Sequence, residues 1–120
     1  MKDDKLKKII KILKALSDES RIRIVNLLKA KSGVCVCEIT EVINLSQPTI
    51  SSHLKKLEEA GIITFRKDGL WVNYYLSEEM DNESKELIDL IVKIIEKDPA
   101  VKDDLLKVIN TDRALICCKK

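Results

Sequence analysis

The four cysteines of this 120-residue chain lie in two close pairs, Cys35–Cys37 and Cys117–Cys118. Cysteine thiolates bind soft metal and metalloid ions, and the N-terminus of a helix favours the thiolate form. Residues two apart on a helix point about 200° apart. Cys35 must therefore lie just before a helix that contains Cys37 if both sulfurs are to converge. The pairs predict a thiolate site for a soft ion, with a thiol–disulfide switch and inert buried cysteines as the alternatives.

The surroundings of the first pair do not favour an enzyme. A thioredoxin-type oxidoreductase places Cys-x-x-Cys between a strand and a helix, and nothing near Cys35 resembles that context. We predict a protein with no catalytic residues and no organic cofactor.

A second chemical pattern lies between residues 46 and 60. Ile50, Leu54 and Leu57 form a narrow apolar stripe at helical spacing. The opposite face begins with small uncharged polar residues and continues with lysines, as in a helix that enters the DNA major groove. An ordinary solvated helix face favours Glu, Lys and Ala instead. The predicted DNA-binding residues of this segment are Ser46, Gln47, Thr49, Ser51, Ser52, His53, Lys55 and Lys56.

Their expected roles differ. Ser46 is also the expected cap of the helix. Gln47, Thr49, Ser51 and Ser52 are expected to read base edges, and the two lysines to hold phosphates. His53 lies beside the apolar stripe, so it either packs at its edge or touches a phosphate.

Composition limits the class of protein. The chain is 45% hydrophobic and 35% charged, which predicts one folded domain. A net charge of +2 says little about nucleic acid, so any basic surface must be local. The N-terminus lacks the apolar core of a signal peptide, and no apolar run is long enough to cross a bilayer. We therefore expect a cytoplasmic protein with reduced thiols and no membrane partner.

Periodicity predicts the elements that position these residues. Helices are expected at 6–16, from 17 or 18 to 31, at 38–43, at 47–60, at 81–97 and at 101–109. Strands at 62–66 and 70–76 flank Lys67-Asp68-Gly69, which predicts a hairpin. It is either a wing, with Arg66 and Lys67 at a tip that contacts phosphates, or a hairpin that only closes the core.

Apolar side chains cover more than half of the circumference of the helix at 81–97, and the first helix has a similar excess. One small domain cannot bury so broad a surface. A second copy of the chain can, which predicts a homodimer.

The order of these elements and four sequence strings resemble the ArsR/SmtB family of winged-helix repressors. The strings are LSDESRIRI at 16–24, VCVCEI at 34–39, LSQPTISSHLK at 45–55 and KDGLWVNYY at 67–75. The resemblance covers about residues 6–97. It implies a mainly α fold with a β-hairpin wing, a winged helix-turn-helix of order α-α-α-α-β-β-α. It also implies a homodimer formed through the first and last of these helices.

The resemblance further implies a repressor that binds double-stranded operator DNA without ligand and is released by a metal or metalloid. Residues 1–97 would be the DNA-binding and dimerisation domain, and residues 98–120 a C-terminal helix with a cysteine-containing tail. Two recognition helices would enter successive major grooves about 34 Å apart.

Family members place the inducer site in different elements. One site uses histidine with Asp or Glu on the long dimer helix, but the only histidine here is His53, so we reject a zinc site there. The other begins with Cys-Val-Cys, which matches Cys35 and Cys37, although Thr40 stands where a third cysteine often follows. Trivalent arsenic prefers three sulfurs in a pyramid.

Cys117 or Cys118, from the same subunit or its partner, could supply the third sulfur. The resemblance thus implies As(III) or a related soft ion as the inducer, with a cadmium or lead sensor or a redox-responsive repressor as alternatives.

Overall fold

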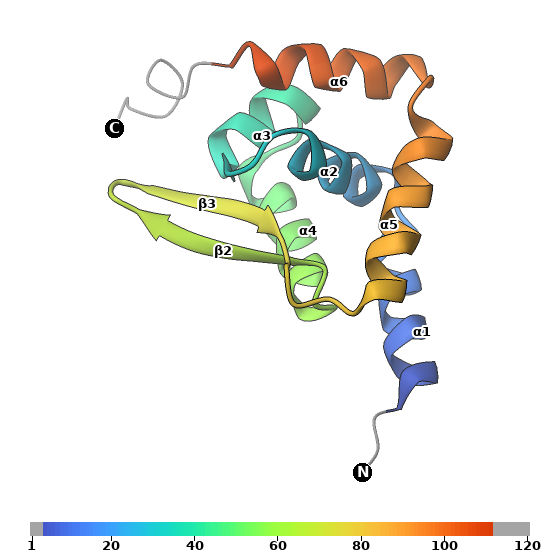
Figure 1. Cartoon of the computed structure of the whole chain (residues 1–120). Coiled ribbons are helices and arrows are strands. Elements are labelled where there is room, and N and C mark those ends of the chain that lie inside the picture. Colours follow the sequence, from blue (N-terminus) through green and yellow to red (C-terminus); the bar gives the residue numbers. More distant parts are fainter. Residues whose placement is uncertain (1–3, 112–120) are drawn as a thin grey trace.

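The computed structural model describes residues 4–111, which form six helices and three strands in this range (Figure 1). The elements are α1 (Lys5–Leu16), α2 (Glu19–Ala30), β1 (Val34–Cys35), α3 (Val36–Ile43), α4 (Gln47–Glu59), β2 (Ile63–Asp68), β3 (Trp71–Leu76), α5 (Asn82–Ile95) and α6 (Pro99–Ile109). The predicted mainly α fold with a β-hairpin wing is confirmed. Helix α6 is the helix predicted at 101–109, and the strand β1 is the element that was not predicted.

Short polar side chains and a left-handed residue set the helix boundaries, which lie close to the predicted ones. The Asp18 carboxylate caps α2, and the Ser46 hydroxyl accepts from the Thr49 amide at the start of α4. Asn44 ends α3 in the left-handed conformation with φ 63°, and this tight break joins α3 to α4. The α3–α4 pair is therefore a helix-turn-helix unit.

The sheet is antiparallel with strand order β1-β3-β2. Asp68 pairs with Trp71, so the hairpin turn is Gly69–Leu70 and not the predicted Lys67-Asp68-Gly69. Gly69 has φ +63°, which suits a tight two-residue turn with glycine first. Leu70 thus leaves the strand that we expected it to begin, and Lys67 and Asp68 join the other strand.

The core lies among α2, α3 and α4. Ile24, Leu27, Ile39, Ile50 and Leu57 have no exposed side-chain area. Helix α6 crosses above α2 and α3 and contributes Val108 to the same core (Figure 1). The buried carboxylate of Asp104 on α6 accepts two hydrogen bonds from Arg23 on α2, both at 2.8 Å. Helix α6 is therefore docked on the domain by apolar packing and by a bidentate ion pair.

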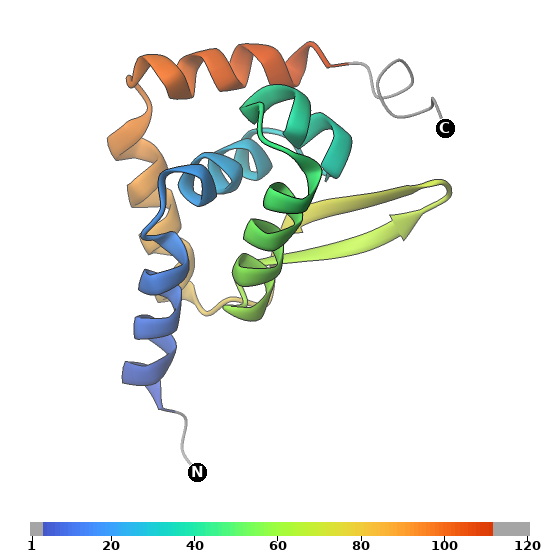
Figure 2. The same ribbon diagram turned by 180° about the vertical axis from the view of Figure 1, so that it is seen from behind.

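Helices α1 and α5 lie along one edge of the molecule (Figure 2), where Lys8 on α1 pairs at 3.7 Å with Asp81, the N-cap of α5. Large apolar side chains on these two helices remain exposed: Leu6, Ile10, Leu13, Leu90 and Ile94. The broad apolar faces predicted for the two helices are thus only partly buried within one chain. Within residues 4–111, no helix has the length and hydropathy to span a membrane.

Candidate DNA-binding surface and cysteine site

The recognition helix α4 presents the predicted polar face to solvent. Ile50, Leu54 and Leu57 hold the helix on the core. The residues predicted to read bases or hold phosphates on this helix are all exposed, namely Ser46, Gln47, Thr49, Ser51, Ser52, Lys55 and Lys56. Because the apolar stripe fixes the rotation of α4, these side chains face outward together at its N-terminal end and along one side.

His53 differs from its neighbours because it faces α2. Its Nδ1 atom lies 3.2 Å from Nη1 of Arg21 and 3.9 Å from the Asp18 carboxylate. A guanidinium only donates hydrogen bonds, so Nδ1 accepts and the proton of the neutral ring is on Nε2. Arg21 also donates from Nε to the Ala15 carbonyl oxygen at 2.7 Å. His53 therefore packs at the edge of the stripe and ties α4 to α2, while a contact of its Nε2–H with DNA stays a prediction.

The two basic residues of the wing lie on opposite faces of the hairpin. Successive strand residues alternate, so Arg66 lies on the face of Asn73 and Tyr75, and Lys67 on the face of Phe65 and Val72. The Arg66 guanidinium lies 4.1 Å from the centre of the Tyr75 ring. A side-chain hydrogen bond with Tyr75 is the main cause that raises the pKa of Arg66 above its ordinary value.

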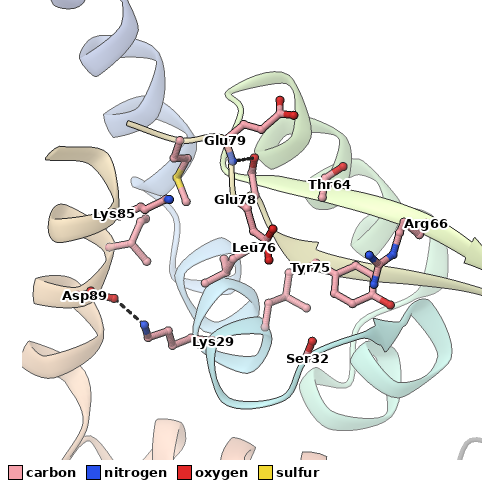
Figure 3. Close-up of a pocket in the computed structure, with 14 residues that line it drawn as sticks. Lys29, Ser32, Thr64, Arg66, Tyr75, Leu76, Glu78, Glu79, Lys85 and Asp89 are labelled. Carbon is pink, nitrogen blue, oxygen red and sulfur yellow. Dashed lines mark hydrogen bonds and ion pairs between the residues drawn. The ribbon is translucent and has the colours of Figure 1, made fainter. Parts of the chain in front are cut away.

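The Arg66 face borders a cavity of about 590 Å³ between α2, α5 and the base of the wing (Figure 3). The cavity rim carries both charge signs, and Lys29 and Asp89 pair across it at 2.7 Å. Because Arg66 and Lys67 lie on opposite faces of the hairpin, we do not expect them to bind the same phosphate. Each is expected to contact a different part of the DNA backbone.

The first cysteine pair lies at the junction of β1 and α3. Cys35 is the last residue of β1 and the N-cap of α3, with extended backbone angles of φ −90° and ψ 165°. Cys37 lies in the first turn of α3 and is partly buried. Cys35 thus lies just before the helix that holds Cys37, as convergence of the two sulfurs requires.

The remaining ligands of a cysteine site are not among residues 4–111. Cys117 and Cys118 lie outside the described residues. Within the described part, no group of three or more His, Cys, Asp or Glu side chains could hold a metal ion. The donor set of Cys35 and Cys37 suits a soft ion, and a complete three-sulfur site needs a ligand from beyond residue 111.

Glu38 connects the cysteine pair to two other helices, and the sequence analysis did not identify it. Its carboxylate is 1% exposed. One oxygen accepts from the Cys35 amide at 3.1 Å, and the other accepts from Lys31 Nζ at 2.6 Å and from the Thr111 hydroxyl at 2.9 Å. Cys35 and Glu38 form a capping box, in which cysteine takes the place of the usual serine or threonine. That three-residue spacing was a signal that could have identified Glu38.

Thr111, the last described residue, therefore lies beside the start of α3. Through Glu38, it is two hydrogen bonds from the Cys35 backbone. Helix α6 delivers the end of the described chain to the cysteine pair of the same subunit.

Comparison with known proteins places this arrangement among transcriptional regulators. Residues 18–64 match the family described as "Bacterial regulatory protein, arsR family". The chain is 41% identical to an uncharacterized HTH-type transcriptional regulator of Methanocaldococcus jannaschii, over 73% of this chain and 96% of that protein. It is 33% identical to the arsenic resistance transcriptional regulator ArsR2 of Pseudomonas putida, over 89% of this chain and 95% of that one.

A solved structure has the same architecture. HlyU from Vibrio cholerae superposes with a TM-score of 0.67 and 30% sequence identity, over 80% of this chain and all of that one.

Proposed function

Because this chain belongs to the ArsR family of DNA-binding transcriptional regulators and is not an enzyme, we propose that it is a homodimeric repressor released from its operator by a soft ion. Trivalent arsenic is the first candidate for that ion. The observation that carries the proposal is the position of Cys35 and Cys37, which immediately precede the helix-turn-helix unit that reads DNA. A relative that covers most of the chain is an arsenic resistance regulator by name, which supports the choice of ion.

The DNA-bound form is a dimer joined through α1 and α5. The exposed apolar residues of these helices are the surface that a second copy would cover, because isolated monomers rarely leave so many large side chains in water. In this dimer, Gln47, Thr49, Ser51 and Ser52 read base edges, while Lys55, Lys56, Arg66 and Lys67 meet phosphates.

The inducer site consists of Cys35, Cys37 and a tail cysteine, either Cys117 or Cys118. When bound, a soft ion would hold these sulfur atoms together through strong, directional bonds. Residues of the chain would then transmit the change from the ion site to α4. Cys35 caps α3, so a change in its position moves the start of the helix-turn-helix unit, and α3 passes the movement to α4 through the turn at Asn44.

The position of Thr111 supports a site built within one subunit. Six residues of extended chain span about 20 Å. A tail cysteine six or seven positions after Thr111 can therefore reach sulfurs on the other side of Glu38 without crossing to the partner.

Titration of the reduced protein tests the proposal. Ultraviolet absorbance of the sulfur–ion bond would be followed with arsenite, cadmium and zinc, and operator binding would be measured by gel shift in the same samples. We expect one arsenite per subunit and operator release, and both are expected to be lost in Cys37→Ser but kept in Thr40→Ser, a control in the same helix. Full release of Cys37→Ser by arsenite would remove this cysteine from the mechanism. Release by cadmium alone would change the ion but keep the site.

Mixed dimers test whether the site is built within one subunit. One subunit would carry Cys35→Ser and Cys37→Ser, and the other Cys117→Ser and Cys118→Ser. If each site is built within one subunit, the mixed dimer contains no complete three-sulfur site. If each site is built across the interface, the mixed dimer contains one. Recovery of one high-affinity arsenite per dimer would therefore refute the single-subunit arrangement.

A redox-responsive repressor is the second candidate, because Cys37 is disulfide-bonded in this structure. Oxidation would then release DNA with no ion present. If operator binding persists under oxidant and is lost when arsenite is added, the result favours the ion-responsive repressor over the redox-responsive one.

A further inference from the structure

The cysteine site is connected to the wing by a row of residues across the sheet. Cys35 on β1 pairs with Asn73 on β3, and Asn73 pairs with Arg66 on β2. Directly opposed residues of antiparallel strands project their side chains from the same face, with Cβ atoms about 4.5–5.5 Å apart. One face of the sheet therefore carries, in order, a predicted ion ligand, a buried amide and a predicted phosphate contact.

The amide in the middle of this row holds the turn of the wing. Asn73 is 7% exposed and donates from Nδ2 to the Asp68 carboxylate at 2.8 Å. The same carboxylate oxygen accepts from the Tyr75 hydroxyl at 2.9 Å. The Tyr75 ring lies under the Arg66 guanidinium, as the close-up shows (Figure 3). A displacement of Asn73 thus reaches both the hairpin turn and the arginine.

We propose that Asn73 is a positioning residue that transmits the ligand state of Cys35 to the wing, so that ion binding moves Arg66 as well as α4. This inference rests on the proposed function, since it assumes that Cys35 binds the inducer. It adds a second connection to DNA that does not pass through α3.

The small size of β1 supports this connection. The strand has only two residues, and one of them, Cys35, is also the helix cap. Only one other pair, Val34 with Tyr74, holds β1 on the sheet, so β1 has little length over which to absorb a shift of Cys35 toward Cys37. The shift must change the pairing with Asn73, and the hydrogen bond to Asp68 links that change to the turn.

The single tryptophan reports on the wing without any substitution. Trp71 pairs with Asp68 beside the hairpin turn. In the reduced wild-type dimer, we expect Trp71 fluorescence to change on arsenite or cadmium addition and to saturate at the same ion equivalents as the sulfur–ion absorbance. Ion binding with unchanged Trp71 emission would refute the proposal and leave the proposed function intact. No ion binding at all would refute the proposed function, and this inference with it.

Two variants that each remove a hydrogen bond to Asp68 separate coupling between Cys35 and the wing from a general loss of order in the wing. Asn73→Leu keeps the side-chain size but removes the donor to Asp68. Tyr75→Phe removes the other donor to the same oxygen, and with it the side-chain hydrogen bond to Arg66, while the ring stays under the guanidinium. We expect both to bind the ion as the wild type does. Only Asn73→Leu is expected to lose the Trp71 response, and its ratio of ion-free to ion-bound operator affinity should fall by roughly 2- to 30-fold. An unchanged ratio in Asn73→Leu, or an equal loss in Tyr75→Phe, would overturn the assignment.

Discussion

Replacing Glu38 by alanine is expected to lower the free energy of unfolding by about 3–4 kcal/mol. Glu38 is one of few buried charged side chains in the described part of the chain, and it joins β1, α2 and the end of α6 at one carboxylate. Its removal therefore tests whether this junction holds the cysteine pair in place.

The magnitude follows from the three partners. The Cys35 amide would be left unsatisfied in a residue that is only 4% exposed, at a cost of about 1–3 kcal/mol. The Lys31 ammonium would lose a charged hydrogen bond worth about 1.5–3 kcal/mol in a buried setting. Its side chain is 30% exposed, so hydration recovers part of this loss. The Thr111 hydroxyl can donate its one proton to the Val108 carbonyl oxygen instead, at 2.9 Å, so its loss adds little.

Urea denaturation followed by circular dichroism is the assay. Since urea slopes are about 1–3 kcal/mol per M for small proteins, the midpoint should fall by about 1–4 M in Glu38→Ala. Glu38→Gln keeps an acceptor for the Cys35 amide and should lose about half as much. Glu41→Ala is the matched control, because Glu41 is exposed on the same helix. Equal small losses, below about 0.5 kcal/mol, in Glu38→Ala and Glu41→Ala would refute this reasoning.

Three further variants test the surface, the docking of α6 and a helix cap. Lys67→Ala should weaken binding to all duplexes alike and reduce the slope of log affinity against log salt by about one, as measured by anisotropy titration. Asp104→Ala should destabilise the fold by about 2–4 kcal/mol in urea denaturation, because Arg23 loses its bidentate partner and keeps only the exposed Glu19 carboxylate at 3.7 Å. The double variant Arg23→Met with Asp104→Leu should recover most of the loss. The Ser84 amide is the main cause that lowers the pKa of Asp81 below 3.8. The stability from Asp81 is therefore present above about pH 4 and is lost as pH falls through the lowered pKa. Asp81→Asn should flatten the fall of the melting temperature between pH 4 and pH 2.5.

Local sequence signals predicted most of the helices because their causes are local. Asp18 and Ser46 cap the helices that follow them, and Asn44 takes the left-handed conformation that ends α3. The apolar stripe of α4 fixes its rotation, so the exposed polar face could be inferred from spacing alone. The predicted placement of Cys35 before α3 follows from the same helical geometry.

Local sequence signals could not predict contacts between residues that are far apart in the sequence. Strand β1 has two residues, too few for an alternating pattern, and only its pairing with β3 identifies it. The burial of Glu38 depends on Lys31 and on Thr111, a residue 73 positions away. The hairpin turn moved by one residue because pairing of Asp68 with Trp71 is set across the strands, and this shift lengthened the wing.

At the junction of β1 and α3, both elements that we propose to contact DNA are one step from a cysteine. Helix α4 follows α3 through the turn at Asn44, and the wing is joined to β1 through Asn73. Each route is short, so neither needs a long chain of coupled side chains. Because the routes separate at Cys35, blocking one should reduce the response of DNA affinity to the ion without abolishing it. A complete loss of response in Asn73→Leu would mean that the wing alone carries the coupling and that α4 does not move.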